Sequence, residues 1–290
     1  MNLWQEYRLP TSISEAIQDL QTAKKPVMPI AGGTDLLLDI KQGRQLAVHT
    51  LVDLTSISEM SIIDMREEEL FIGAAVPINR IVHNPLVKEH AEALVESCNL
   101  IAGLQVRNTA TLGGNVAHAL PAAEGTIALT SLDAQAEVAN AAGLRRTPLQ
   151  ALFTGPGKSS LNKSEEILTG FYLPKCLPHQ ASCFNRIMRP QGVALPILNC
   201  AVWIARDKSH VQDIHIAVGP GGPTPFRAVE AENNLRGQMY NDKSFTNMLD
   251  ILLNEARFRS SPRRASAQYR QLVVCSLLKQ TLDTAWSRAV

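Results

Sequence analysis

Two adjacent glycines join an apolar strand to an apolar helix near the start of the chain, within PIAGGTDLLLDIKQG at residues 29–43. The run Val27–Ala31 before the pair is short and apolar and follows Lys-Pro, as expected of a buried strand. The simplest explanation of the pair is that Gly32 and Gly33 only supply the positive φ of a tight turn. The residues after the pair suggest a second role.

Those residues have the pattern of a short helix. Thr34 is predicted as its N-cap, Asp35 is acidic in its first turn, and Gly43 ends it. Backbone N–H groups at a strand-to-helix turn of this kind point outward at a helix N-terminus, where they attract an anion. The first glycine turn therefore also suits a negatively charged ligand.

A second glycine pair, Gly113-Gly114, follows a segment at residues 85–104 whose apolar residues recur at helical spacing. Thr111 precedes this pair and Asn115 follows it, so polar side chains accompany both glycine turns. One pair alone is a weak signal, but two such turns can hold a single extended phosphate group from both sides.

Length and charge narrow the class of protein. The 290 residues suffice for one large domain or two ordinary ones. Lys and Arg number 28 against 27 Asp and Glu, and no basic stripe recurs, which argues against nucleic-acid and anionic-membrane partners. The sequence favours proteins and small molecules as partners.

The chain is predicted to be cytoplasmic and to lack a membrane span. Its first ten residues have no apolar core of a signal peptide, and no apolar run approaches the roughly 18–20 residues of a membrane helix. The five cysteines are scattered without a C-x-x-C motif, which fits a reducing compartment and excludes a local iron–sulfur motif.

The composition changes at residues 174–180, where Pro, Lys and His cluster, so a domain boundary is predicted there. Beyond it, the apolar runs Ile197–Ile204 and Ile214–Val218 indicate antiparallel strands. The chain then ends in helices, and Pro262 is predicted to begin the last one. The buried stripe of that helix is predicted to contain Tyr269, Leu272, Val273, Cys275, Leu277, Leu278 and Leu282.

Six segments, taken in order, resemble one known family over nearly the whole chain. In the first half they are AGGTDLL, LVDLTSISEM and QVRNTATLGGNVAHALPAAEGTIALTSLDAQAEV. In the second half they are TGPGKSSLNKSEEILTGFYLP, GPGGPTPFRAVEAENNLRG and RRASAQYRQLVVCSLLKQTL. They resemble the FAD-binding medium subunit of the molybdenum hydroxylases, the xanthine dehydrogenase and carbon monoxide dehydrogenase flavoprotein family.

The resemblance implies an α+β fold in two parts. Residues 1–175 would form an FAD-binding domain of the PCMH/vanillyl-alcohol-oxidase-like type, with two α/β subdomains and the flavin between them. Residues 180–287 would form an antiparallel sheet backed by helices, of the CO dehydrogenase flavoprotein C-terminal type.

The resemblance also implies which residues bind FAD. Both glycine turns would approach the pyrophosphate, with no Cβ in the way, and further residues would contact the sugar hydroxyls, the adenine or the flavin. The predicted cofactor-binding residues are Ala31, Gly32, Gly33, Thr34, Asp35, Ile101, Thr111, Leu112, Gly113, Gly114, Asn115, Glu124, Leu168 and Asn185.

Three features depart from the family pattern, and one pair of residues allows another interpretation. Glu124 stands where the family usually has an aspartate, and Asn185 stands where a basic residue is often found, with Arg186 and Arg189 as substitutes. The stretch RPQGVALPILNCAV lacks the aspartate that the family usually carries there. Ile101 and Leu168 can be ordinary core residues instead of flavin or adenine contacts.

The function implied by the resemblance is electron transfer. A large subunit with the molybdenum cofactor would oxidise the substrate, and a small subunit with two [2Fe–2S] clusters would pass electrons to FAD on this chain. FAD is the only cofactor predicted here, and no catalytic residue or metal ligand is predicted. One alternative is a scaffold or binding subunit that keeps the fold without flavin. Another is a self-sufficient flavoenzyme, which would need an acid–base constellation that the sequence does not show.

Two further motifs have plain explanations. His118, beside the second glycine turn, is interpreted as a packing or hydrogen-bonding group, because no partner at a telling spacing makes it an acid–base residue. Arg263-Arg264 resembles a kinase site. Its arginines are expected to be solvated on the helix surface or to hold a neighbouring segment.

Overall fold

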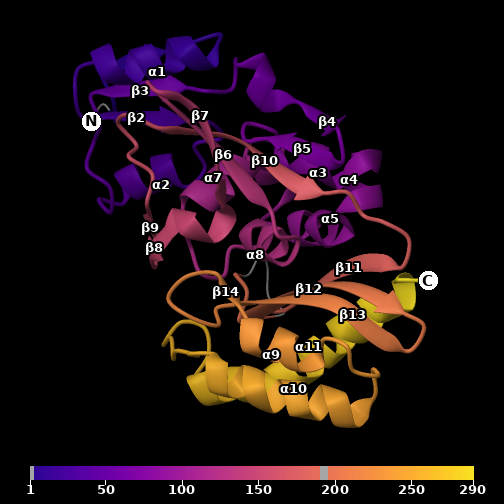
Figure 1. Cartoon of the computed structure of the whole chain (residues 1–290). Helices are drawn as coiled ribbons and strands as arrows, with labels where there is room; N and C mark the ends of the chain where they lie inside the picture. Colours follow the sequence, from indigo (N-terminus) through magenta and orange to yellow (C-terminus); the bar gives the residue numbers. More distant parts are fainter. Residues whose placement is uncertain (1–2, 190–194) are drawn as a thin grey trace.

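A computed structural model describes residues 3–189 and 195–290 and contains three main sheets with helices between and around them (Figure 1). The first sheet is parallel, with strand order β1-β3-β2. Its elements, with the helices that follow β1 and β2, are β1 (Glu6–Arg8), α1 (Ile13–Thr22), β2 (Val27–Ile30), α2 (Leu36–Lys41) and β3 (Thr50–Asp53). The predicted strand before the first glycine pair is thus confirmed as β2.

The second sheet is antiparallel, with strand order β4-β5-β10-β6-β7. Its strands are β4 (Ile63–Arg66), β5 (Glu69–Gly73), β6 (Gln135–Asn140), β7 (Gly143–Pro148) and β10 (Ile167–Pro174). Short elements flank it, namely η1 (Ser58–Ser61), η2 (Leu149–Leu152), β8 (Phe153–Gly155) and β9 (Lys158–Ser159).

Short helices cover one side of the second sheet. They are α3 (Ile78–Val82), α4 (Pro85–His90), α5 (Glu92–Asn99), α6 (Leu104–Arg107), α7 (Leu112–Ala117) and α8 (Glu124–Ser131). The single helix predicted over residues 85–104 is wrong, because Ala91 has φ −147° and ψ 54° and separates α4 from α5. Every residue of α8 is buried, since α5 and α8 lie between the second and third sheets (Figure 1).

The third sheet is antiparallel, with strand order β11-β12-β13-β14. Its strands are β11 (Gln180–Ile187), β12 (Leu198–Asp207), β13 (His210–Gly219) and β14 (Phe226–Arg227), so the two predicted strands are confirmed. Side chains alternate between its faces. Phe184, Ala201 and Ala217 join the core around α5 and α8, whereas Cys183 and Val202 face the C-terminal helices. Those helices are α9 (Val229–Leu235), α10 (Asp242–Glu255) and α11 (Ala267–Arg288).

The last helix begins later than predicted. Pro262 lies in a turn before it, and Ser266 is the N-cap, with its side chain accepting a hydrogen bond from the Tyr269 backbone N–H. Leu277, Leu278 and Leu282 are buried as predicted. The prediction is wrong for Tyr269, which is 43% exposed, for Leu272, which is 75% exposed, and for Cys275, which is also exposed. The helix instead buries Arg270, because backbone carbonyls of neighbouring segments receive its guanidinium.

The predicted boundary at residues 174–180 coincides with the connection from β10 to β11. Because Phe184 and Ala201 on one side share a core with α5 and α8 on the other, the two parts of the chain pack tightly. The division into 1–175 and 180–287 stays a prediction. Among the residues that the structure describes, no helix has the length and apolar character needed to cross a membrane.

A buried carboxylate on α9 is expected to stabilise the packing of this helix on the third sheet. Glu232 accepts a hydrogen bond from the Ile216 backbone N–H at 2.7 Å and pairs with Arg227 at 2.9 Å. Glu232→Ala leaves both donors buried without this partner, so we expect it to lower the free energy of unfolding by about 3–5 kcal/mol in urea titrations. Glu230→Ala, on an exposed position of the same helix, is the control and should have little effect; equal losses would contradict the assignment.

Candidate cofactor site

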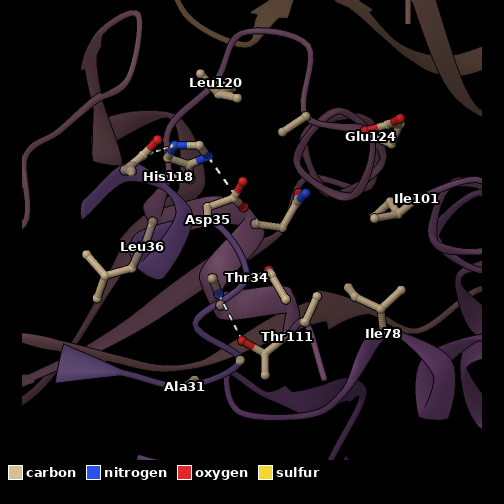
Figure 2. Close-up of a pocket in the computed structure, with 18 of the residues that line it drawn as sticks. Ala31, Thr34, Asp35, Leu36, Ile78, Ile101, Thr111, His118, Leu120 and Glu124 are labelled. Carbon is tan, nitrogen blue, oxygen red and sulfur yellow. Dashed lines mark hydrogen bonds and ion pairs between the residues drawn. The ribbon is translucent and has the colours of Figure 1, made fainter. Parts of the chain in front are cut away.

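One cavity of about 620 Å³ brings the two glycine turns together with the C-terminal part of the chain. The first turn, α7 and the start of α8 contribute to its walls (Figure 2). The segment before α11 contributes a further wall. All of the predicted cofactor-binding residues line this cavity except Leu112 and Asn185. Leu112 is fully buried in the core beneath the second turn.

The first glycine turn exposes a row of backbone donors. In the described part of the chain, none of the backbone N–H groups of residues 32–35 donates to a backbone carbonyl. Thr34 is not the helix cap, because α2 begins at Leu36 and its N-cap is Asp35, whose side chain makes no capping bond. Gly43 has φ +69° just beyond the helix, as predicted. The turn therefore keeps its N–H groups for a ligand that accepts hydrogen bonds.

Glycine is required at the two positions of the first turn for different structural reasons. Gly33 has φ +65°, a conformation that favours glycine, so the simple explanation holds for this residue. Gly32 is required for packing, because a Cβ there would lie 2.3 Å from the carbonyl oxygen of Thr109. The pair thus sets the shape of the turn and lets it lie directly on the segment before α7.

At the second glycine turn, the backbone N–H groups of both glycines already donate hydrogen bonds to other groups of the protein. The N–H groups of Gly113 and Gly114 donate to the Ala74 carbonyl at 2.9 Å and to Thr111 Oγ1 at 3.1 Å. Gly113 packs on Ala74, whose carbonyl oxygen would lie 2.6 Å from a Cβ, whereas a Cβ on Gly114 would meet only Thr111 Oγ1, at 3.2 Å. Gly114 is therefore the position of this turn where a ligand can approach the backbone closely.

Asn115 adds a side-chain donor to the second turn. Its Oδ1 accepts hydrogen bonds from the backbone N–H and the hydroxyl of Thr126, each at 3.1 Å. These bonds fix the amide, and its Nδ2 group has no protein acceptor among the residues described. The two turns thus make unequal contributions, with backbone N–H groups from the first and an amide from the second.

His118 connects the two turns across the cavity wall. Its Nδ1 lies 3.6 Å from Asp35 Oδ2 and its Nε2 lies 3.5 Å from Asp39 Oδ2 (Figure 2). Sequence reasoning found no carboxylate partner for this histidine because both aspartates lie in the first turn and α2, about 80 positions earlier. The imidazole accordingly joins α2 to the C-terminal end of α7.

Glu124 lies at the start of α8 and forms a buried ion pair with Arg186, at 2.6 Å between Oε1 and Nη1. Burial raises the pKa of Glu124, and the Arg186 charge opposes that shift. The Arg186 Nε is buried without a partner among the described residues. The basic group that pairs with Glu124 is therefore Arg186, which was predicted as a substitute for Asn185.

Asn185 was predicted to bind the cofactor, but the structure places it away from the cavity lining. Because successive residues of β11 face opposite sides of the sheet, Arg186 faces α8 and Asn185 faces α11. The Asn185 amide donates to Thr281 Oγ1 at 3.3 Å and to Cys183 Sγ at 3.4 Å. The prediction about RPQGVALPILNCAV concerns residues 190–194 in part, and these lie outside the described residues.

Sequence reasoning missed a set of arginines on the C-terminal wall of the cavity. We call this set the arginine cluster; it consists of Arg259, Arg263, Arg264 and Arg270. Arg263 and Arg264 had been assigned to the helix surface or to a neighbouring segment, and Arg270 falls within the apolar stripe of α11. The available signal was the density of arginine in the RRASAQYR motif.

Comparison with known proteins identifies the class of protein. Residues 4–176 match the family model described as the FAD binding domain in molybdopterin dehydrogenase, and residues 182–285 match the CO dehydrogenase flavoprotein C-terminal domain. The chain belongs to this family and is an FAD-binding medium subunit of the molybdenum hydroxylase type. The family and fold predicted from the sequence are thereby confirmed.

Individual relatives match along almost their full length. A putative xanthine dehydrogenase FAD-binding subunit of Escherichia coli (strain K12) is 27% identical, with 98% of this chain and 96% of that protein covered. The nicotinate dehydrogenase FAD-subunit of Eubacterium barkeri is 27% identical, with 95% and 94% covered. The solved carbon monoxide dehydrogenase of Hydrogenophaga pseudoflava is similar with a TM-score of 0.93 at 25% identity, covering 99% of this chain and 98% of the matched chain.

The different surroundings of the glycines predict unequal tolerance to alanine. Gly32→Ala forces a Cβ against the Thr109 carbonyl, so it should lower the free energy of unfolding by about 1–3 kcal/mol. Gly114→Ala requires only a small shift of the Thr111 side chain and should stay within about 1 kcal/mol of the parent chain. Chemical unfolding of both variants measures the difference, and a Gly114→Ala loss as large as that of Gly32→Ala would refute this account.

Proposed function

We propose that this chain relays electrons within a heteromeric molybdenum hydroxylase and binds FAD in the cavity between the two glycine turns. A small subunit with two [2Fe–2S] clusters would deliver the electrons, and a large subunit with the molybdenum cofactor would oxidise the substrate. Relatives described as FAD-binding or medium subunits support this assignment. We also propose that the complex is cytoplasmic.

The observation that carries the proposal is the row of backbone N–H groups at residues 32–35, which have no backbone acceptor in the described ranges. Such a row suits the diphosphate of FAD, because each phosphate oxygen accepts several hydrogen bonds from backbone donors. Gly114, opposite, leaves room for a close approach, and the Asn115 amide adds a donor. The residues present therefore fit the cofactor that the family binds.

Other residues of the cavity would orient the cofactor and exclude water. Ile101 and Leu168 supply apolar walls suited to an aromatic ring, and Glu124 supplies a carboxylate that is held in place by Arg186. FAD, when bound, accepts electrons singly and releases them in pairs, which suits a subunit between one-electron clusters and a two-electron acceptor. The protein supplies the binding, orientation and electrostatic surroundings of the ring.

The departures from the family pattern at Glu124 and Asn185 do not favour the flavin-free scaffold. Asn185 faces α11 and is remote from the cavity wall, so the absence of a basic side chain there leaves the site intact. Glu124 lines the cavity with its carboxylate fixed by Arg186, so the longer side chain remains available to a hydroxyl group. Both positions are compatible with a bound flavin.

The visible absorption spectrum of the purified chain tests the proposal. We expect flavin bands from tightly bound FAD, or their appearance when FAD is added to a colourless preparation. Gly114→Val places a side chain where the backbone is open and should weaken FAD binding by at least about tenfold, equivalent to about 1.4 kcal/mol. Titration of FAD, followed through flavin fluorescence, measures the affinity of each variant.

Gly155→Val is the matched control, because Gly155 lies outside the cavity lining and a Cβ there would come no closer than 3.6 Å to its neighbours. Its FAD affinity should equal that of the parent chain. A folded parent chain that takes up no FAD would overturn the proposed function. Full FAD affinity in Gly114→Val would remove the second turn from the binding site.

A further inference from the structure

A strained turn between α5 and α6 forms part of the cavity wall. It contains Ala102 and Ile101, and the proposed function places Ile101 against an aromatic ring of FAD (Figure 2). We propose that Arg107, the last residue of α6, is a positioning residue that holds this turn in the conformation that contacts FAD. This inference rests on the proposed function, because the turn has a ligand to contact only if FAD occupies the cavity.

Ala102 has a backbone conformation that alanine rarely adopts. Its φ is +43°, in the left-handed region, where the Cβ crowds the following carbonyl oxygen. Six non-glycine residues of the described chain have positive φ, and of these Ala102 alone lines the cavity. Strained backbone persists only where the surrounding structure holds it, and such backbone is concentrated at ligand sites. Some group beside the turn must therefore keep Ala102 in this conformation.

The guanidinium of Arg107 holds the turn through its backbone. Its Nη1 donates to the carbonyl of Ile101 at 3.0 Å and to the carbonyl of Ala102 at 2.9 Å. Neither carbonyl accepts a backbone N–H among the residues that the structure describes. The two carbonyls belong to the peptide groups before and after Ala102, so the two bonds together restrain its φ and ψ. Hydrogen bonds from a charged donor are stronger than neutral ones, which suits them to holding a strained residue.

The other contacts of Arg107 and α6 do not explain the position of this side chain. In the ranges 3–189 and 195–290, the guanidinium has no carboxylate partner, and its Nε is buried without a hydrogen bond. A buried donor without a partner costs free energy, so the bonds to the turn must offset that cost. Helix α6 buries none of its residues, and Leu104 on it is 53% exposed. Apolar packing of α6 therefore contributes little to holding the turn.

FAD titration of the full chain, followed through flavin fluorescence, tests the role of Arg107. We expect Arg107→Gln to weaken FAD binding by about tenfold, because it removes two charge-assisted hydrogen bonds and lets Ala102 relax out of the left-handed region. Arg107→Lys keeps a charged donor and should recover most of the affinity. Urea unfolding of each variant without FAD measures general stability, and the freed carbonyls can reach water in this half-exposed turn, so the unfolding midpoint should change little.

Ala102→Gly tests whether Arg107 acts through the strained residue. Glycine adopts positive φ without the crowding that a Cβ causes, so the turn then depends less on the arginine. The double variant Ala102→Gly/Arg107→Gln should bind FAD about threefold more tightly than Arg107→Gln, with Ala102→Gly measured as the reference that completes the cycle.

Arg206→Gln is the matched control. Arg206 is also a half-buried arginine whose Nη1 donates to a backbone carbonyl, that of Trp286 at 3.0 Å, but it lies outside the cavity lining. Its FAD affinity should equal that of the parent chain.

The remaining outcomes separate this inference from the proposed function. Parent-like FAD affinity in Arg107→Gln would overturn the inference, as would a double variant that binds no better than Arg107→Gln. An Arg107→Gln chain that does not fold would make Arg107 a general structural residue and would also overturn it. A folded parent chain that takes up no FAD would refute the proposed function and this inference together, whereas FAD uptake that is unaffected by Arg107→Gln refutes this inference alone.

Discussion

Close backbone contact at the two glycine turns is the constraint on which the site depends. A Cβ on Gly32 would collide with the carbonyl of Thr109, and a Cβ on Gly113 would collide with that of Ala74. Through these contacts the parallel sheet, the segment before α7 and the antiparallel second sheet meet at one place. Because protein interiors are close-packed, the positions of the turns are fixed by this packing before a ligand binds. The donors of the first turn are thus oriented by the fold itself.

The third sheet supports the site from behind and is buried on both faces. Helices α5 and α8 cover one face, and α9 to α11 cover the other (Figure 1). The alternation of side chains along β11 therefore separates two environments one residue apart. Arg186 reaches Glu124 beside the cavity, and Asn185 reaches Thr281 beneath α11. Strand β11 thus contacts both the start of α8 beside the cavity and the C-terminal helix.

Local patterns predicted the strands and the position of both glycine turns, because those features depend on residues close in sequence. The cap of α2 was assigned to Thr34 instead of Asp35, since a one-residue shift hardly changes the local pattern. The partners of His118 and the burial of Arg270 could not be predicted. Both depend on groups that only the folded chain brings near, namely the aspartates of the first turn and α2 and the Ile197 carbonyl.

The two walls of the cavity carry different charges. On the wall of the first turn, neutral N–H donors lie beside Asp35 and Asp39, whose carboxylates flank His118. A phosphate there is held by many short, directed hydrogen bonds against nearby negative charge, which requires exact fit and suits a resident cofactor. On the opposite wall, exposed guanidinium groups such as that of Arg263 act over longer distances and are screened by salt. Such groups raise the rate at which an anion enters the cavity without demanding one geometry.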